Sequence, residues 1–369
     1  MQLVSELLVP LQIDLTQFAG TLQNVVAFIV VFGMLVFVHE LGHFLVAKLN
    51  GVQVHEFALG FGPALFQKRW GETLYAIRVI PLGGFVKLAG MEPTENLPDE
   101  LVGTNEDGER AFHRKHPLQR MAILAAGPLM NFVLAVLIYA GLFMTLAVAV
   151  VNVHEGLPAD VAGLQPGDLI VGINDENVRG LNAGELIRRI QAVGEQPVRL
   201  EVVRDGAVEH LVVTPTIDPE RGVPILGVEL TMVPAGIQQG IMKSLGDGIR
   251  YTGSVIKTFY FWISEVFAGR AQAELSGPIG IFQLTGAASQ AGILALLQLT
   301  ALLSINIAIF NLLPIPILDG GGLLFVIIEM IRRRPLSARS KGIAQMIGLS
   351  LLLLLMIFAT IHDIENFGS

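Results

Sequence analysis

Long apolar runs separated by polar loops dominate the chain, and they predict membrane-spanning helices. A helix needs about 20 mainly apolar residues to cross a membrane. The first run continues past the polar pair His39-Glu40, and the third is interrupted near its end by Pro314 and Pro316. We therefore predict a polytopic α-helical membrane protein with about four transmembrane helices, in residues 22–49, 121–151, 292–318 and 343–361.

Residues 54–88, between the first two runs, form an unusual loop with a strand-like part. Residues 73–80 are rich in β-branched and aromatic side chains, Pro81-Leu82-Gly83-Gly84 favours a turn, and residues 85–88 return. We expect a membrane re-entrant β-hairpin or small sheet. Non-helical backbone at membrane depth must be buried in protein or face a water-filled cavity. Residues 91–110 are acidic and polar and predict a mobile linker.

Residues 150–232 predict a small soluble β-rich domain. It contains a turn at Gly167-Asp168 before an apolar strand, a helical stretch at 183–193 and two further strands. Residues 236–270 combine helical spacing with mixed polarity, which indicates an amphipathic helix on the membrane surface. An ordinary packing helix fits the same periodicity equally well.

These elements divide the chain into consecutive regions. They are residues 1–50 with the N-terminal segment and first span, 51–119 with the re-entrant β loop and polar linker on the cytoplasmic side, 120–149 as the second span, 150–232 as the β-rich domain, 233–290 with the amphipathic helix and the loop SGPIGI, 291–334 as the third span, and 335–369 as the fourth span and C-terminal tail.

Composition agrees with a membrane protein and narrows the chemistry. Hydrophobic residues make up 52% of the chain and charged residues 15%, against about 25% charged in an average soluble domain. The net charge of −8 argues against nucleic-acid binding. The chain has 0 cysteines, so disulfides and cysteine-ligated metals are excluded, and a tightly bound transition metal must use histidines and carboxylates.

Lysine and arginine are distributed unevenly, and this predicts the orientation. Residues 1–46 have none, the 47–120 loop has nine and the 331–341 segment has five. Basic loops face the cytoplasm, so both termini and the β-rich domain are expected outside it. The N-terminus lacks the basic stretch of a cleavable signal peptide, and we expect no cleavage.

The first span carries the HExxH pattern as His39-Glu40-Leu41-Gly42-His43. Residues four apart share one face of a helix, so both imidazoles can bind one metal ion, and Glu40 can take a proton from a metal-activated water. Ionisable groups inside a membrane are costly and are usually functional. The alternative is that these polar groups only pair with one another inside the helix bundle.

A catalytic zinc takes three protein ligands and keeps one position open. Asp319 is a well-placed carboxylate for the third ligand, because it follows the proline-broken run 311–318 and precedes Gly320-Gly321-Gly322. The alternative is that Asp319 only caps the helix that begins near Gly320.

Three membrane motifs, in this order, resemble the site-2 protease family of intramembrane zinc metalloproteases. They are HELGH in the first span, Gly127-Pro128-Leu129-Met130-Asn131 in the second, and the run from Asn311 through Asp319-Gly320. Residues 162–168 resemble part of a PDZ domain. The combination resembles the bacterial regulator of sigma-E protease group with a single PDZ domain.

The resemblance implies roles for individual residues. Zinc would be held by His39, His43 and Asp319, with Glu40 as the catalytic glutamate. Asn311 would orient the substrate or stabilise the oxyanion, and Asn131 would support the site, although both asparagines fit interhelical hydrogen bonding as well. The hairpin would pair with an unwound substrate by strand addition, with Tyr75, Gly83 and Gly84 as its supporting residues.

The resemblance also implies a function. We expect a zinc-dependent endopeptidase in the bacterial inner membrane that cleaves transmembrane segments of other proteins, such as a membrane-bound anti-sigma factor or signal-peptide remnants. The partners would be substrates already cut by another protease, membrane lipid, and a C-terminal peptide at the PDZ-like domain, which could instead only exclude bulky substrates. Gly322 stands where many relatives have a basic residue or histidine, and the best-known enterobacterial member has two PDZ domains.

Three other classes of protein remain open at this point. A non-catalytic membrane scaffold would use the PDZ-like domain and need no metal. A zinc transporter would be expected to have more intramembrane carboxylates and histidines. An isoprenyl-type membrane endopeptidase would need a glutamate as third ligand in a later span, for which Glu329 is the candidate.

Overall fold

The computed structural model describes residues 15–91, 108–178, 183–219, 221–236, 240–270 and 277–367. The chain forms two compact units, residues 1–135 with 258–369 and residues 136–257. Most of the predicted mobile linker, residues 92–107, lies outside the described residues, and so does Ser276 of the predicted SGPIGI loop.

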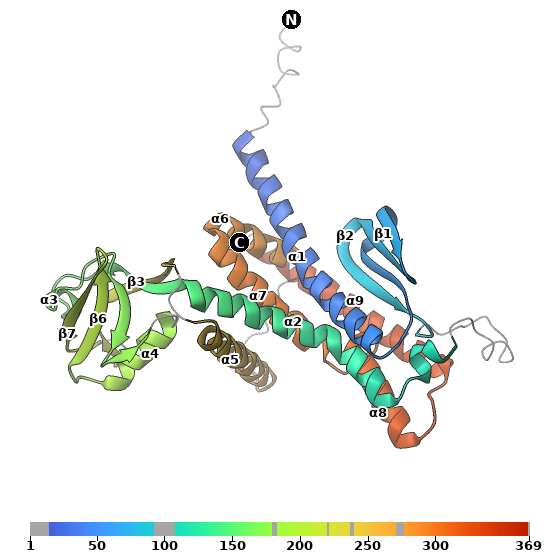
Figure 1. The fold of residues 1–369 in the computed structure, drawn as a ribbon. Helices are drawn as coiled ribbons and strands as arrows, with labels where there is room; N and C mark the ends of the chain where they lie inside the picture. Colours follow the sequence, from blue (N-terminus) through green and yellow to red (C-terminus); the bar gives the residue numbers. More distant parts are fainter. Residues whose placement is uncertain are drawn as a thin grey trace, which may run out of the picture. The chain divides into compact units, whose positions relative to one another are not determined.

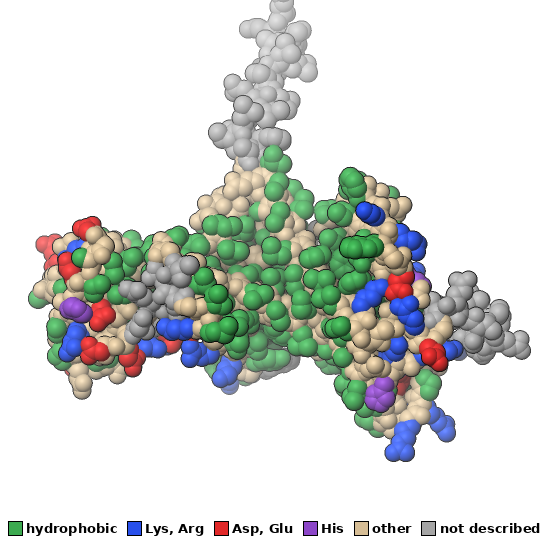
Figure 2. Space-filling model, in the orientation of Figure 1, with side chains coloured by type: hydrophobic (Ala, Val, Ile, Leu, Met, Phe, Trp, Pro, Cys, Tyr) green, Lys and Arg blue, Asp and Glu red, His purple; other side chains and the backbone are tan. Residues whose placement is uncertain are grey.

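Within the described residues, four helices are long and apolar enough to cross a membrane: α1 (Leu15–Leu49, of which residues 20–49 qualify), α2 (Pro117–Thr145), α7 (Ile293–Asn311) and α9 (Ala338–Phe367, of which residues 338–364 qualify). On the face seen in Figure 2, many apolar side chains gather over the helices. A polar solvent would make such surfaces costly, so the finding supports the prediction of four spans.

Two predicted boundaries are wrong. Helix α2 ends at Thr145, and residues 146–151, predicted as the end of the second span, form a strand. The third span also ends earlier than residue 318, at the interruption predicted from Pro314 and Pro316. Helix α7 ends at Asn311, residues 312–318 form a loop, and a separate helix α8 (Asp319–Arg332) follows. Pro314 and Pro316 lack the backbone N–H groups that a continued helix would need.

The predicted SGPIGI loop is also corrected, because Pro278–Ala291 form helix α6. Proline is well suited to the first turn of a helix, where its missing N–H has no intrahelical partner. Helix α6 packs on α1 (Figure 1): Gln23 Nε2 donates a hydrogen bond to Ser289 Oγ at 3.0 Å. A Cβ on Gly286 would lie 2.8 Å from Asn24 Cγ, so glycine permits the close approach.

The first unit also contains a small sheet of two long, bent strands, β1 (Val54–Trp70) and β2 (Thr73–Leu88). Residues 57–59 lie opposite residues 75–77 on one side and opposite residues 84–86 on the other. In the first pairing, the residue numbers of both segments increase in the same direction, and in the second they increase in opposite directions. Strand β2 therefore reverses its direction between Ile80 and Gly84, as predicted. Strand β1 was not predicted. The bent strands pack against α1 (Figure 1), and residues 84–88 form one edge of the sheet.

Two short 3₁₀ turns, Gly108–Arg110 and Phe112–Arg114, precede α2. Phe112 is buried in a cluster with Ala47 and Val52 at the end of α1 and with Leu88 of β2. This cluster joins the end of the sheet edge to α1, which carries the two histidines, and to α2, which packs beside them.

The second unit contains the predicted β-rich domain. Its elements are β3 (Leu146–Val153), α3 (Pro158–Val161), β4 (Leu169–Ile173), β5 (Glu176–Asn177), α4 (Ala183–Val193), β6 (Val198–Arg204), β7 (Ala207–Val213), β8 (Thr216–Ile217), β9 (Pro224–Ile225) and β10 (Val228–Pro234). The main sheet has the order β10-β3-β4-β6-β7, and α4 packs its buried Leu186 and Ile190 into the core. The helix predicted at 183–193 and the strand after Gly167-Asp168 are confirmed.

Asp168 in that turn is a structural residue. Its carboxylate accepts hydrogen bonds from Arg204 at 2.7 and 2.8 Å and from the backbone N–H of Gln165 at 2.9 Å. Burial opposes ionisation, but these three donors outweigh it and lower the pKa of Asp168. The predicted amphipathic helix is α5 (Ile241–Phe267), which begins in this unit.

Candidate active site

Helix α1 places the two HExxH histidines on one face. His39 Nε2 and His43 Nε2 are 3.3 Å apart. Both side chains are 12% exposed, so they are largely shielded from solvent. Two neutral imidazole nitrogens at this distance cannot both present lone pairs to each other without a cation or proton between them. The helix therefore builds the two-nitrogen half of a metal site.

Asp319 completes the cluster from the first position of α8. Its Oδ2 lies 3.1 Å from His39 Nε2, and its Oδ1 lies 3.4 Å from His43 Nε2. Among the described residues, these three are the group whose ligand atoms lie close enough for one metal ion. The loop of residues 312–318 returns the chain so that Asp319 faces α1. The structure thus brings together the three predicted ligands.

The geometry fits a tetrahedral zinc ion. Bonds of about 2.0–2.1 Å to nitrogen and oxygen place ligand atoms roughly 3.3 Å apart. The two Nε2 atoms are 3.3 Å apart, and each lies near a different oxygen of Asp319, Oδ2 at 3.1 Å from His39 and Oδ1 at 3.4 Å from His43. Asp319 Oδ2 is buried without a hydrogen-bond partner of acceptable geometry despite its nearness to His39. A buried carboxylate oxygen in that state is well explained by a metal ligand.

The other ring nitrogens of the histidines are held by α2. His43 Nδ1 lies 2.8 Å from the carbonyl oxygen of Ile123, so it donates, and Nε2 is then free for a metal. His39 Nδ1 lies 3.3 Å from Asn131 Nδ2, while the buried Asn131 Oδ1 has no partner. The two ends of an amide have the same shape. With the amide turned over, Oδ1 accepts from His39 Nδ1–H.

Glu40 faces a cavity of about 270 Å³ that the metal cluster also lines. The other wall is the sheet edge, with Gly84, Phe85 and Val86. A Cβ on Gly84 would lie 3.3 Å from Glu40 Cγ, so the absence of a side chain lets the strand approach the glutamate. Glu40 is therefore placed between the cluster and the sheet edge, where a general base would need to be.

The remaining predicted site residues differ in their positions. Asn311 lines the cavity, although its Nδ2 donates to the carbonyl of Ile307 at 3.0 Å. Gly83 lies outside the cavity lining and has φ +106°, where a Cβ would overlap the ring of Phe61. The structure does not bring Tyr75 to the cavity. Its ring packs with Phe44 and Phe57, at centroid distances of 5.9 and 6.2 Å.

The comparisons with known proteins agree with this arrangement. The family model described as Peptidase family M50 matches residues 27–355. The chain belongs to this family. It is 33% identical over 419 residues to the regulator of sigma-W protease RasP of Bacillus subtilis, which covers 93% of this chain and 98% of the relative. It is also 33% identical over 430 residues to the zinc metalloprotease RasP of Geobacillus kaustophilus, covering 94% of this chain and 99% of the relative.

Among solved structures, the PDZ domain of an SdrC-like protein from Listeria innocua is 30% identical to the part of this chain that it matches. The match covers 23% of this chain and 92% of the PDZ domain, with a TM-score of 0.20. The chain is therefore a zinc-dependent metalloendopeptidase, because it belongs to the M50 family and has relatives named zinc metalloproteases. Its apolar helices are those of a membrane protein.

Glu329 is not a metal ligand in this M50 peptidase. Its carboxylate pairs with Arg120 at 2.9 Å and Lys341 at 2.8 Å and accepts from the backbone N–H of Leu336 at 3.1 Å. All of its oxygens are therefore engaged away from the two histidines. The isoprenyl-type arrangement with Glu329 as third ligand is wrong.

Sequence reasoning missed three parts of the site. Gly127 of the GPLMN motif must be glycine, because a Cβ there would overlap His43 Nε2 and lie 2.8 Å from His39 Nε2. The carbonyl of Ile123 has no side-chain signal at all. Ser304 is fully buried, and its Oγ donates to the backbone carbonyl of Asn131 at 2.8 Å, which links α7 to α2. Only Gly127 could have been found from its place in a motif.

Proposed function

We propose that this protein cleaves peptide bonds within or near transmembrane segments, with His39, His43 and Asp319 as zinc ligands and Glu40 as the general base. The observation that carries the proposal is the shared cavity. The three ligand atoms, Glu40 and the exposed edge of a β-sheet line one space beside an apolar helix bundle. A peptide placed along that edge would present its backbone to the metal cluster.

Zinc bound at this site would polarise the scissile carbonyl and lower the pKa of a bound water. Glu40 would accept the proton of the attacking water and return it to the leaving amine. Asn311 lines the same cavity and would donate a hydrogen bond to the oxyanion, after release of its bond to Ile307. Asn131 would hold the His39 ring in the tautomer that leaves Nε2 for the metal.

The substrate would have to be unwound before cleavage. The carbonyl groups of a transmembrane helix are already hydrogen-bonded and covered by side chains. An extended segment could pair with residues 84–88 of β2, whose outer edge lines the cavity, and receive from the strand the backbone hydrogen bonds that it loses on unwinding. Substrates with helix-weakening residues at the cleavage site should therefore be preferred.

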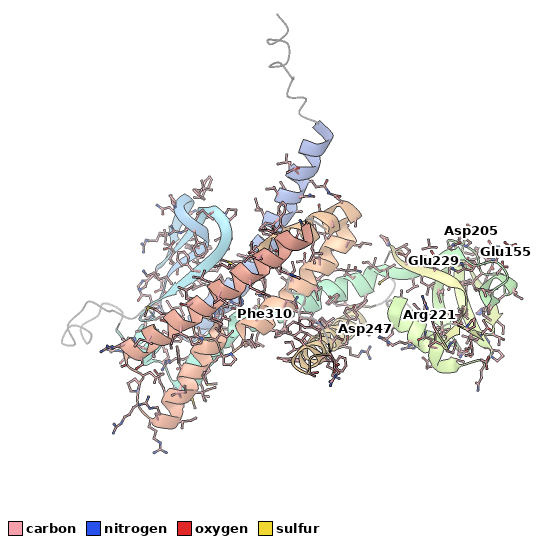
Figure 3. The ribbon with its side chains drawn as sticks, turned by 180° about the vertical axis from the view of Figure 1, so that it is seen from behind. Glu155, Asp205, Arg221, Glu229, Asp247 and Phe310 are labelled. Atoms are coloured by element: carbon pink, nitrogen blue, oxygen red, sulfur yellow. The ribbon has the colours of Figure 1, made fainter. Side chains whose placement is uncertain are left out.

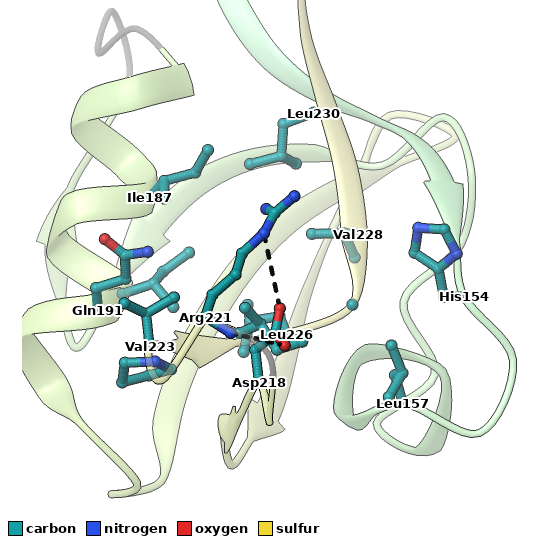
Figure 4. A pocket seen from close by; sticks show the side chains of 14 residues that line it. His154, Leu157, Ile187, Gln191, Asp218, Arg221, Val223, Leu226, Val228 and Leu230 are labelled. Atoms are coloured by element: carbon teal, nitrogen blue, oxygen red, sulfur yellow. Dashed lines mark hydrogen bonds and ion pairs between the residues drawn. The ribbon is translucent and has the colours of Figure 1, made fainter.

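The β-rich domain would control access to the site. A groove of about 470 Å³ lies between α4 and the edge strand β10, with Ile187 and Gln191 on one wall and Val228 and Leu230 on the other (Figure 4). An edge strand beside an apolar helix face can bind an extended peptide. We propose that this peptide is the C-terminus of a substrate that another protease has already cut. A membrane-bound anti-sigma factor is the proposed substrate class, by analogy with the sigma-W relative.

The charge distribution supports an orientation for these parts. The basic loops around residues 47–120 and 331–341 would face the cytoplasm of the bacterial inner membrane. Both termini and the β-rich domain would then be extracytoplasmic, the sheet would re-enter the membrane from the cytoplasmic side, and α5 would lie on the outer surface. Cysteine scanning with membrane-impermeant reagents is straightforward because the chain has 0 native cysteines.

The decisive experiment compares wild type with Glu40→Gln, purified and assayed on a model substrate that contains one transmembrane segment. We expect Glu40→Gln to retain one zinc per chain and to lose cleavage by at least about 10²-fold, because a positioned general base contributes 10²–10⁴-fold. Undiminished cleavage would overturn the role of Glu40. A non-catalytic scaffold would give no cleavage in either protein.

A matched pair of substrates tests the unwinding step. One has glycine or proline at the cleavage site, and the other has leucine and alanine there. Faster cleavage of the first by wild type is expected, whereas equal rates would contradict the requirement for unwinding.

A further inference from the structure

The loop that carries the chain into Asp319 contains a strained residue. Ile317 has φ +98°, a conformation that is a genuine outlier for a β-branched side chain. Its side chain is 46% exposed, so burial of that side chain does not explain why the conformation persists. Strained backbone persists only where the surroundings determine it. The constraint must therefore act on the backbone of residues 312–318.

Two glycines of α8 lie in close contact with the backbone of this loop on one side. A Cβ on Gly320 would overlap the carbonyls of Leu312 and Leu313, and a Cβ on Gly321 would overlap the carbonyl of Ile315 and lie 2.7 Å from Cα of Pro316. These contacts come from the same helix that begins at Asp319. They fold the loop back over the first turn of α8 but do not fix it to the rest of the unit.

Helix α9 presses on the same loop from the other side, through Gly348. A Cβ on Gly348 would overlap the carbonyl oxygen of Pro316 and lie 2.8 Å from its carbonyl carbon and 3.2 Å from its Cβ. The neighbour is backbone, which cannot move aside as the end of a flexible side chain can. Gly348 is buried, whereas most of α9 is exposed and apolar, including Leu354 and Ile357. The contact with Pro316 is thus a specific one.

Two further attachments set the position of α9 along its axis. Near its start, Lys341 pairs with Glu329 of α8 at 2.8 Å. Near its end, the buried Asp363 accepts hydrogen bonds from the backbone N–H groups of Gly277 and Gly280 at 3.0 and 2.9 Å, at the start of α6. Helix α6 packs on α1, which carries the histidines. Gly348 lies between these two attachments, so its register against Pro316 is fixed from both ends.

We infer that Gly348 is a positioning residue for the third metal ligand. Its missing side chain lets α9 close on the Pro316 backbone, which holds Ile317 in its strained conformation and aims Asp319 at His39 and His43. The inference rests on the proposed role of Asp319 as a ligand. It adds a residue far from the reacting atoms in sequence, on a helix that contributes no side chain to the cavity lining.

The test uses full-length Gly348→Ala and Gly348→Leu, with Gly33→Ala and Gly33→Leu as matched controls. Gly33 is also in a membrane helix, and a Cβ there meets nothing within 4 Å. The readouts are the zinc dissociation constant by chelator competition and the visible absorption of the cobalt-substituted protein, which reports ligand geometry independently of activity. We expect Gly348→Ala to weaken zinc binding about 10–100-fold, as loss of a ligand-orienting contact does, and to change the cobalt spectrum.

Ile317→Gly tests the same constraint from the loop if a Gly348 variant fails to fold. Glycine tolerates the conformation at residue 317 but also many others, so the aim of Asp319 should be lost and zinc binding should weaken several-fold. Wild-type zinc affinity and cobalt spectra in the folded Gly348 and Ile317 variants would overturn the inference. Unchanged zinc affinity in Asp319→Ala would instead overturn the proposed ligand set, so the two failures are distinguishable.

Discussion

Helix α8 carries two shielded carboxylates, one at each end, in opposite electrostatic surroundings. Glu329 near its end is surrounded by donors, with Arg120, Lys341 and a backbone N–H all within 3.1 Å. Asp319 at its start faces two imidazoles that are neutral unless protonated, and one of its oxygens is buried without a partner. A buried charge without a cation is costly. The difference teaches that Glu329 is fully paired as a structural group, whereas Asp319 has an oxygen that a zinc ion would satisfy, in agreement with its proposed role as a ligand.

The largest expected effect follows from removing the incomplete carboxylate. Asp319→Ala should weaken zinc binding about 10²–10³-fold, because a zinc-binding free energy of about 10–16 kcal/mol shared among four ligands is about 2.5–4 kcal/mol each. Cleavage should be lost with the metal. Metal analysis after dialysis against a chelator measures this directly. Stoichiometric zinc in the variant would contradict the comparison at its central point.

The complete carboxylate should respond in the opposite way. Glu329→Gln leaves Arg120 and Lys341 without their partner, and breaking a buried ion pair costs roughly 3–5 kcal/mol. We expect the low end of that range, because Lys341 is 28% exposed. The midpoint temperature of thermal unfolding in detergent should fall, while the zinc stoichiometry should stay at one per chain. If Glu329→Gln lost zinc but kept its stability, Glu329 would be the metal-binding carboxylate and not the structural one.

Asn131 sharpens the comparison, because it holds a ligand without being one. Asn131→Ala removes the partner of His39 Nδ1, and outer partners of metal ligands typically contribute 10–100-fold in affinity or activity. Asn131→Asp keeps an acceptor for Nδ1–H and should recover much of the loss. If alanine and aspartate behave alike in chelator competition, the asparagine only joins helices and does not orient the ring.

The smallest effect is expected at Glu72, a carboxylate that is paired like Glu329 but more exposed to solvent. Hydrogen bonds from Arg110 and then Lys48 lower its pKa to about 2, from an ordinary value of 4.5. The stabilisation is therefore present above about pH 4.5 and is lost as the pH falls towards 2. Glu72→Gln should cost less than about 1 kcal/mol at pH 7, since exposed ion pairs contribute little. Unfolding curves of wild type and variant should approach each other as the pH falls from about 4.5 and converge only near pH 2 or below, and a constant gap at all pH values would contradict this.

The metal site could be predicted from the sequence to the extent that spacing determines geometry. His39 and His43 are on one helix, so their separation follows from helical periodicity alone. Asp319 was predicted by its place after the prolines and before the glycines. The carbonyl of Ile123 and the backbone contact of Gly348 could not be predicted, because neither carries a side-chain signal and both depend on tertiary packing.

The fold shows the same division. The strands and helix α4 of the β-rich domain were predictable, and strand β6 is an example in which buried and less buried positions alternate. Strand β1 was not predictable, because residues 61–70 are exposed along their whole length and show no alternation of burial. The break near Pro314 and Pro316 was predictable from the prolines, but the extent of the loop over residues 312–318 was not, because hydropathy is the same in a span and in an apolar loop. Phe310, at the end of α7 just before this loop (Figure 3), is apolar like the rest of the run.

The most direct test of the account is X-ray absorption at the zinc edge of the purified wild-type protein, with Asp319→Ala as the comparison. The account predicts two imidazole nitrogens and low-mass oxygen ligands at about 2.0–2.1 Å. In Asp319→Ala, the zinc signal should fall, or the carboxylate oxygen should be replaced by solvent. Three or more imidazoles in wild type, or an identical spectrum in the variant, would contradict a site made by His39, His43 and Asp319.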